Sequence, residues 1–107
     1  MDKINHINDE IGYLTIKSKT LTYDEFIRDE TLKRAFVRSL EIIGEAVKTI
    51  PKQVLEQYKQ IEWNKISGMR DKLIHHYFGV DYDLVWDVID NHIPKLKETI
   101  ELILNEE

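Results

Sequence analysis

The chain contains no cysteine, and its 107 residues include only four glycines and two prolines. Without cysteine, disulfide bonds and thiolate metal ligands are excluded, and a reducing cytosol is a compatible location. The scarcity of glycine and proline disfavours a turn-rich sheet protein and favours long helices. The sequence also lacks the apolar run of a signal peptide and any apolar stretch of membrane-spanning length. We therefore expect a cytoplasmic protein that does not enter a membrane.

Hydrophobic residues make up 42% of the chain and charged residues 33%, which is typical of a soluble globular protein. The length predicts a single domain over residues 1–107. The formal net charge of −5 argues against a protein that coats nucleic acid, because such binding depends on a basic surface. A few local cations are still enough to hold one phosphate group, and the acidic surface leaves room for a protein or nucleotide partner.

Apolar residues recur at helical spacing along most of the chain. The first stripe consists of Ile4, Ile7, Ile11 and Leu14. Thr22 and Glu25 then match a capping box, in which each side chain satisfies a free backbone donor, so a long helix is expected to follow, bent near residues 29–30. The stripe of that long helix consists of Leu32, Ala35, Phe36, Leu40, Ile43, Val47 and Ile50. Gly44 lies beside this stripe and is expected to allow close packing against another element.

Proline and aspartate mark the element boundaries in the second half of the chain. Pro51 interrupts the long helix, because proline lacks the amide donor, and begins a short helix that reaches Lys59. Residues 63–77 are predicted to form one helix, and Asp81 is the predicted N-cap of the last helix, which Pro94 kinks or divides. No alternating strand pattern competes with this interpretation. We therefore predict an all-α fold, an antiparallel up-and-down helical bundle of about four to five helices.

One short segment combines an arginine, a histidine and a tyrosine in the pattern Arg70-x4-His75-x-Tyr77. Arginine carries an always-charged planar fork that fits phosphate oxygens, and histidine is the side chain best suited to proton transfer near neutral pH. RNA cleavage needs both chemistries. A base must help the ribose 2′-hydroxyl attack the phosphate, an acid must protonate the leaving oxygen, and a cation must stabilise the charge that develops. Arg70 and His75 are therefore candidate catalytic residues.

Helical geometry limits how these side chains can cooperate. On a regular helix ending at Gly79, Arg70 and His75 would be separated by roughly 140° around the axis, whereas Arg70 and Tyr77 would share a face. One arginine and one histidine are also a small catalytic set. A twofold axis beside this helix would let two copies line one cleft, and Gly68 is small enough to permit a close approach there. The spacing therefore favours a homodimer.

Spacing alone leaves structural roles open for the same residues. His75 could interact with a helix dipole, and Tyr77 could be a packed aromatic with a hydrated hydroxyl. Arg70 could simply pair with Asp71 or Glu62 on a solvated face. Motif matches of this kind are hypotheses until further features agree with them.

Further features agree here, because the segment resembles the HepT toxins of the HEPN superfamily. Arg70, His75 and Tyr77 match the family's Arg-x4-His-x-Tyr motif, in which a polar residue such as Asp71 usually follows the arginine. Other segments resemble the family's long helix, its approach to the site and its last helix with an internal proline, namely residues 35–46, 63–70 and 81–103, respectively. The resemblance therefore covers nearly the whole chain.

The resemblance implies a dimeric, metal-independent endoribonuclease without a cofactor, with Arg70 and His75 as catalytic residues at the dimer interface. It also implies a type VII toxin–antitoxin pair in which the partner is an MntA-like nucleotidyltransferase antitoxin. That partner uses ATP to attach AMP to the motif tyrosine, here Tyr77, and the bulky anionic group would fill the space that an RNA phosphate needs. The motif spacing selects His75 over His76, and we assign supporting roles to His76 and Asp71.

Three other interpretations stay open. The first is a non-catalytic HEPN-type dimer that binds nucleotide or RNA, or serves as a scaffold for the transferase, which the acidic charge favours. The second is a metal site of His75, His76 and His92 with Asp81 or Asp83. It is disfavoured because no His-x-x-x-His pair lies on one helix face near the motif. The third is a purely structural helical bundle.

Overall fold

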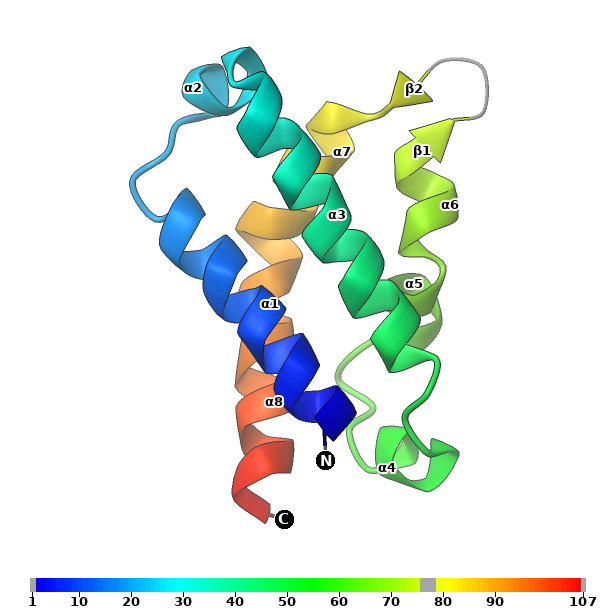
Figure 1. Ribbon diagram of the computed structural model, residues 1–107. Helices are drawn as coiled ribbons and strands as arrows, with labels where there is room; N and C mark the ends of the chain where they lie inside the picture. Colours follow the sequence, from blue (N-terminus) through cyan, green and yellow to red (C-terminus); the bar gives the residue numbers. More distant parts are fainter. Residues whose placement is uncertain (1, 76–78, 107) are drawn as a thin grey trace.

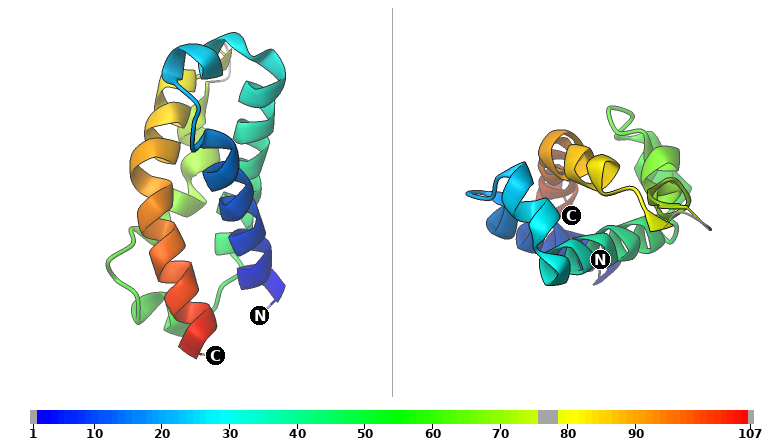
Figure 2. Two further views of the ribbon diagram at one scale, coloured as in Figure 1. Left: turned by 90° about the vertical axis from the view of Figure 1, so that its left-hand side faces the viewer. Right: turned by 90° about the horizontal axis from the view of Figure 1, so that it is seen from above.

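Helices that run alternately in opposite directions build the fold, and the predicted all-α antiparallel bundle is confirmed (Figure 1). The computed structural model describes residues 2–75 and 79–106. The first two antiparallel segments are the long helices α1 (Asp2–Ser18) and α3 (Glu30–Val47). The third consists of the short helices α5 (Trp63–Ser67) and α6 (Met69–Leu73). The fourth begins as α7 (Tyr82–Asp87) and continues through the π-helical turn η1 (Val88–His92) into α8 (Ile93–Glu106). Helix α1 packs against α3 and α8, and α3 also packs against α5 and α6. Seen from above, α1 and α6 lie on opposite sides of the bundle (Figure 2).

The N-terminal helix α1 follows the predicted stripe. Ile7, Ile11 and Leu14 are fully buried, and Ile4 is nearly so, because the helical period places all four on the face that meets α3 and α8. Burying these side chains removes apolar surface from water, which is the main favourable contribution to folding.

The turn between α1 and α3 is fixed by two side-chain caps. The predicted capping box is present at the start of α2 (Tyr23–Arg28), where Thr22 accepts a hydrogen bond from the Glu25 amide and the Glu25 carboxylate accepts one from the Thr22 amide. The expected bend near residues 29–30 is a complete break. Asp29 leaves helical geometry and its carboxylate accepts the Leu32 amide at 2.9 Å, which caps α3.

Aromatic stacking ties this turn to the core. The rings of Phe26 and Phe36, both fully buried, stack with centroids 5.4 Å apart.

At its other end α3 stops at Val47, and Pro51 begins α4 (Lys52–Glu56). The predicted role of Pro51 is therefore confirmed, although the short helix ends before Lys59.

The prediction of a single helix over residues 63–77 is wrong. Helix α5 ends at Ser67, Gly68 interrupts it, and α6 ends at Leu73. The chain then becomes extended in β1 (Ile74–His75), which pairs antiparallel with β2 (Gly79–Val80). The Leu73 carbonyl accepts a hydrogen bond from the Asp81 amide at 2.7 Å, so a long-range pairing takes the place of a further helical turn.

The sequence predicted that Gly79 ends a helix, and this prediction is wrong. It lies in β2 with φ of +80°, a conformation that residues with a Cβ rarely adopt. The expectation that no strand would form is also wrong for this short hairpin. Its two-residue strands carry too few residues for an alternating pattern to be recognised in the sequence.

The last helical segment begins at the predicted cap, and its winding changes directly before Pro94. The Asp81 carboxylate accepts the Leu84 amide at 3.1 Å and caps α7. Directly before Pro94, η1 widens the helix so that the Ile93 amide donates to the Val88 carbonyl. This wider turn accommodates proline, which has no amide hydrogen and would clash with the carbonyl of the preceding turn.

Within the described residues, no helix is both long enough and apolar enough to span a membrane.

Candidate functional site

Arg70 projects from α6 and is held at one edge by an acidic side chain of α3. Its Nε donates a hydrogen bond to Glu41 Oε2 at 3.0 Å. The side chain of Arg70 is 57% exposed, whereas that of Glu41 is only 20% exposed. Because the contact uses Nε, the two terminal Nη groups have no protein partner within the part of the chain that the structure describes. Arg70 is therefore oriented by the protein and still offers donors to an anion.

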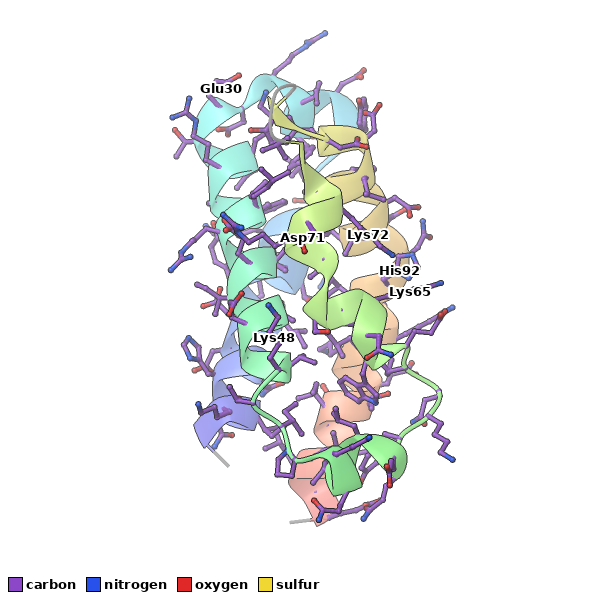
Figure 3. All side chains as sticks on the ribbon, turned by 90° about the vertical axis from the view of Figure 1, so that its right-hand side faces the viewer. Glu30, Lys48, Lys65, Asp71, Lys72 and His92 are labelled. Atoms are coloured by element: carbon purple, nitrogen blue, oxygen red, sulfur yellow. The ribbon has the colours of Figure 1, made fainter. Side chains whose placement is uncertain are left out.

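The sequence suggests Asp71 or Glu62 as the partner of Arg70, but in the structure its partner is Glu41. In the structure Glu62 pairs with Lys65 at 2.8 Å, and Asp71 lies exposed on the outer face of α6 beside Lys72 (Figure 3). Nothing local in the sequence links Glu41 to Arg70. Only the packing of α3 against α6 brings them together.

A glycine allows α5 to lie close to α3. A Cβ atom added at Gly44 would come within 3.1 Å of the Ile66 carbonyl oxygen, which is tighter than most Cβ contacts in proteins. The predicted close packing at Gly44 is therefore confirmed. Since α5 leads directly into α6, this contact also helps to set where Arg70 lies relative to α3. The expectation that Gly68 permits a second subunit to approach stays a prediction.

His75 belongs to a different element from Arg70. It lies in β1, after the end of α6, and its backbone pairs with Gly79. The prediction that Arg70 and His75 project in different directions from one helix is therefore wrong, because that helix ends at Leu73. The prediction that Arg70 and Tyr77 share a helix face requires the same continuous helix and has no basis once α6 ends at Leu73. His76 and Tyr77 themselves lie outside the described residues.

Two of the residues considered for a metal site, His92 and Asp83, contact other side chains. His92 on η1 pairs with Asp87 at 3.6 Å, and Asp83 on α7 accepts a hydrogen bond from the Tyr23 hydroxyl, which raises the pKa of Tyr23. Across residues 2–75 and 79–106, no three histidine or carboxylate side chains gather in a metal-binding arrangement.

Comparison with known proteins gives consistent matches. The family model described as Ribonuclease HepT-like matches residues 7–103. A protein of Caldanaerobacter subterraneus subsp. tengcongensis, an RNase by name, is 47% identical over 97% of this chain and 93% of its own length. A protein of Methanocaldococcus jannaschii, also an RNase by name, is 45% identical over 98% of this chain and 84% of its own. A Thermococcus cleftensis protein, a ribonuclease HepT by name, is 37% identical over 94% of this chain and 91% of its own length. No solved structure matches the chain.

Proposed function

The chain belongs to the HepT-like ribonuclease family, and from this we propose that it is a metal-independent endoribonuclease in which Arg70 and His75 act on one phosphodiester bond. The observation that carries the proposal is the Arg70–Glu41 pair. It holds an exposed guanidinium by Nε and leaves its terminal donors for a ligand. An oriented arginine fork is the group that best fits a phosphate.

The proposed reaction is an internal transfer at phosphorus. The ribose 2′-hydroxyl oxygen attacks the adjacent phosphorus and gives up its proton to a base, and the bond from phosphorus to the 5′-oxygen breaks. An acid protonates that leaving oxygen, so the products are a 2′,3′-cyclic phosphate and a 5′-hydroxyl. His75 supplies proton transfer, and Arg70 stabilises the negative charge on the phosphate oxygens.

We also propose a homodimer, because one histidine cannot serve as base and acid at the same moment. A twofold axis beside α6 would bring two copies of the motif to one cleft. The surface of α6 suits this arrangement, since the consecutive residues Arg70, Asp71 and Lys72 are all exposed. In that cleft Asp71 and His76 would support the binding of RNA.

For regulation, we propose that the chain is the toxin of a type VII toxin–antitoxin pair in the cytoplasm. An MntA-like nucleotidyltransferase antitoxin would use ATP to attach AMP to Tyr77, with loss of pyrophosphate. The added phosphate would compete with RNA for Arg70, because both ligands present anionic oxygens to the same guanidinium.

Two substitutions test the catalytic assignment. We expect Arg70→Ala and His75→Ala each to lower RNA cleavage by at least about 10²-fold, the usual cost of losing a charge-stabilising or proton-transfer group. Arg34→Ala on α3 and His6→Ala on α1 are matched controls, since both side chains are exposed and lie on other elements. Circular dichroism should show that all four variants are folded. Full activity of Arg70→Ala or His75→Ala would remove the mechanism.

The net charge of −5 favours a second candidate, a non-catalytic HEPN dimer that binds nucleotide or RNA or supports the transferase. On that account, the purified wild-type protein would leave RNA intact even at high protein concentration and low salt.

A further inference from the structure

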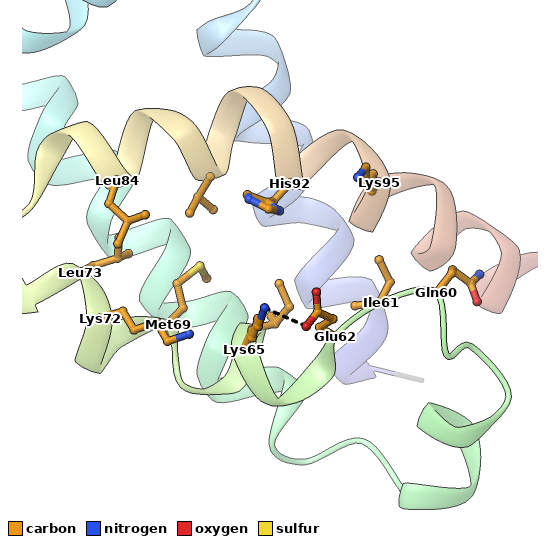
Figure 4. A pocket seen from close by; sticks show the side chains of 12 residues that line it. Gln60, Ile61, Glu62, Lys65, Met69, Lys72, Leu73, Leu84, His92 and Lys95 are labelled. Atoms are coloured by element: carbon orange, nitrogen blue, oxygen red, sulfur yellow. Dashed lines mark ion pairs between the residues drawn. The ribbon is translucent and has the colours of Figure 1, made fainter.

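A groove lies between α5–α6 and the continuous helical segment formed by α7, η1 and α8 (Figure 4). Its volume is about 240 Å³, and its floor is apolar, with Met69, Leu73, Leu84 and Val88 among the lining side chains. This volume is below the roughly 300–1,000 Å³ of clefts that hold drug-sized ligands. The groove therefore has room for one small apolar group rather than for a large ligand.

The rim of the groove is basic although the chain as a whole carries a net charge of −5. Lys65 and Lys72 line one side, and His92 and Lys95 line the other. Glu62 is the acidic residue among the lining side chains. The groove is thus a local concentration of positive charge, which attracts an anionic ligand.

Two of these lysines are available to a ligand. Glu62 pairs with Lys65 at 2.8 Å, and the hydrogen bond from Lys65 lowers the pKa of Glu62, with smaller contributions from the charges of Lys72 and His92. Glu62 is therefore ionised at neutral pH and occupies Lys65. Lys72 and Lys95 form no ion pair with any residue that the structure describes.

We propose that this groove binds one nucleotide of the RNA strand, with its base against the apolar floor and its flanking phosphates on Lys72 and Lys95. The inference rests on the proposed function, because it takes the ligand to be the strand whose scissile phosphate lies at Arg70. Arg70 and Lys72 are two positions apart on α6, one on the flank facing α3 and the other in the groove. A strand that crosses α6 can thus reach both cations.

RNA fits the groove better than a purely acidic peptide does. Every base presents a flat face that stacks on or packs against apolar and aromatic side chains without sequence preference, and each nucleotide adds one phosphate charge. An acidic peptide would satisfy Lys72 and Lys95 and leave the apolar floor uncovered. A single strand supplies both kinds of contact, the flat base to the apolar side chains and the phosphates to the two lysines.

Methionine labelling gives a direct readout of the floor. The chain has two methionines, Met1 and Met69, and Met69 lies in the groove. We expect the ¹³C-methyl NMR signal of Met69 to shift when a 2′-O-methylated hexauridine is added to the wild-type protein, whereas the signal of Met1 stays in place. The 2′-O-methyl groups prevent attack by the 2′-oxygen, so binding is observed without cleavage. A Met69 signal that stays unchanged at saturating RNA would overturn the inference.

Lysine substitutions test the rim. We expect Lys72→Gln combined with Lys95→Gln to raise the Kd for the same RNA about tenfold at low salt, and to reduce the slope of log Kd against log salt by about 0.7 for each lysine. The matched control is Lys97→Gln, since Lys97 lies on the same helix as Lys95 but pairs with Glu101 at 3.4 Å outside the groove. That control should change neither the Kd nor the slope.

The outcomes separate this inference from the proposed function. If the double variant binds RNA as the wild type does while cleavage still requires Arg70 and His75, the groove proposal is wrong and the ribonuclease proposal stands. If the double variant loses RNA binding but the wild type never cleaves, the groove binds RNA and the ribonuclease proposal is wrong. If the double variant alters the oligomeric state and leaves RNA affinity unchanged, the groove is a protein interface and the inference is overturned.

Discussion

The region from α1 to α3 and the region from α5 to β1 are built in different ways. In the first, two long helices bury continuous apolar stripes, and the side chains of Thr22 and Asp29 fix the boundaries of α2 and α3. In the second, α5 and α6 contain five residues each, and neither has a side-chain cap among the described residues. The first region is specified by its own sequence, and the second depends on its neighbours.

This difference bears on function, because the proposed site lies in the region that is less specified locally. Short isolated helices are marginal in water, so α5 and α6 need tertiary contacts to keep their positions. Those contacts come from α3 through Gly44 and Glu41, and from the hydrogen bond between Leu73 and Asp81. Stability and site geometry should therefore respond to different substitutions.

The largest effect on stability is expected in the α1–α3 region. Phe36→Ala should lower the free energy of unfolding by about 3–5 kcal/mol, because it removes a fully buried ring that stacks on Phe26. Urea denaturation would measure the loss, with Ile16→Ala as the control, since Ile16 is 74% exposed. The fraction of Phe36→Ala that stays folded should cleave RNA normally. Equal stability of the two variants would contradict the packing account.

An intermediate effect is expected where the two regions meet. Gly44→Ala should lower the free energy of unfolding by about 1–3 kcal/mol, because the new Cβ meets the backbone oxygen of Ile66 at 3.1 Å. It should also reduce RNA cleavage, because α5 and α6 are displaced. Gly12→Ala in α1 is the matched control. A Cβ there has no neighbour within 4 Å, so that variant should gain up to about 1 kcal/mol of helix propensity. Unchanged cleavage by a destabilised Gly44→Ala variant would show that the contact does not position the site.

The smallest effect on stability is expected at the site itself. Glu41→Gln should change the free energy of unfolding by no more than about 0.5 kcal/mol, since the pair with Arg70 is partly exposed. It should lower kcat about tenfold because Arg70 is held less firmly, and it should not raise KM, because a negative charge near the RNA phosphates is removed.

Glu45→Gln is the control for that substitution, since Glu45 lies one turn later on α3 and pairs with Lys48 instead. Introduced together with Arg70→Ala, Glu41→Gln should have no further effect, because Glu41 acts only through Arg70. A rise in KM with unchanged kcat, or a loss that persists without Arg70, would be inconsistent with a positioning role.

The sequence predicted those features of the fold that depend on neighbouring residues. The stripe of α1, the capping box at Thr22, the role of Pro51, the cap at Asp81 and the disruption before Pro94 all follow from local chemistry, and the structure confirms them. Each of these features forms from residues that are close in the sequence, whichever helices later pack together.

Features that depend on distant partners were not predictable in this way. The pairing of β1 after Leu73 needs β2 and Asp81, and the partner of Arg70 lies 29 residues earlier in the chain. Spacing and resemblance identify the residues of the motif, but their predicted geometry requires a helix that continues past Leu73, where α6 ends.

The central claim is that Arg70 and His75 cleave RNA without a metal ion. Its most direct test is the digestion of a defined RNA in EDTA, with mass spectrometry of the new ends. The account predicts 2′,3′-cyclic phosphate and 5′-hydroxyl ends, formed at the same rate with EDTA as with Mg²⁺ and absent with His75→Ala. A strict requirement for Mg²⁺, or new ends that carry a 5′-phosphate and a 3′-hydroxyl, would contradict it.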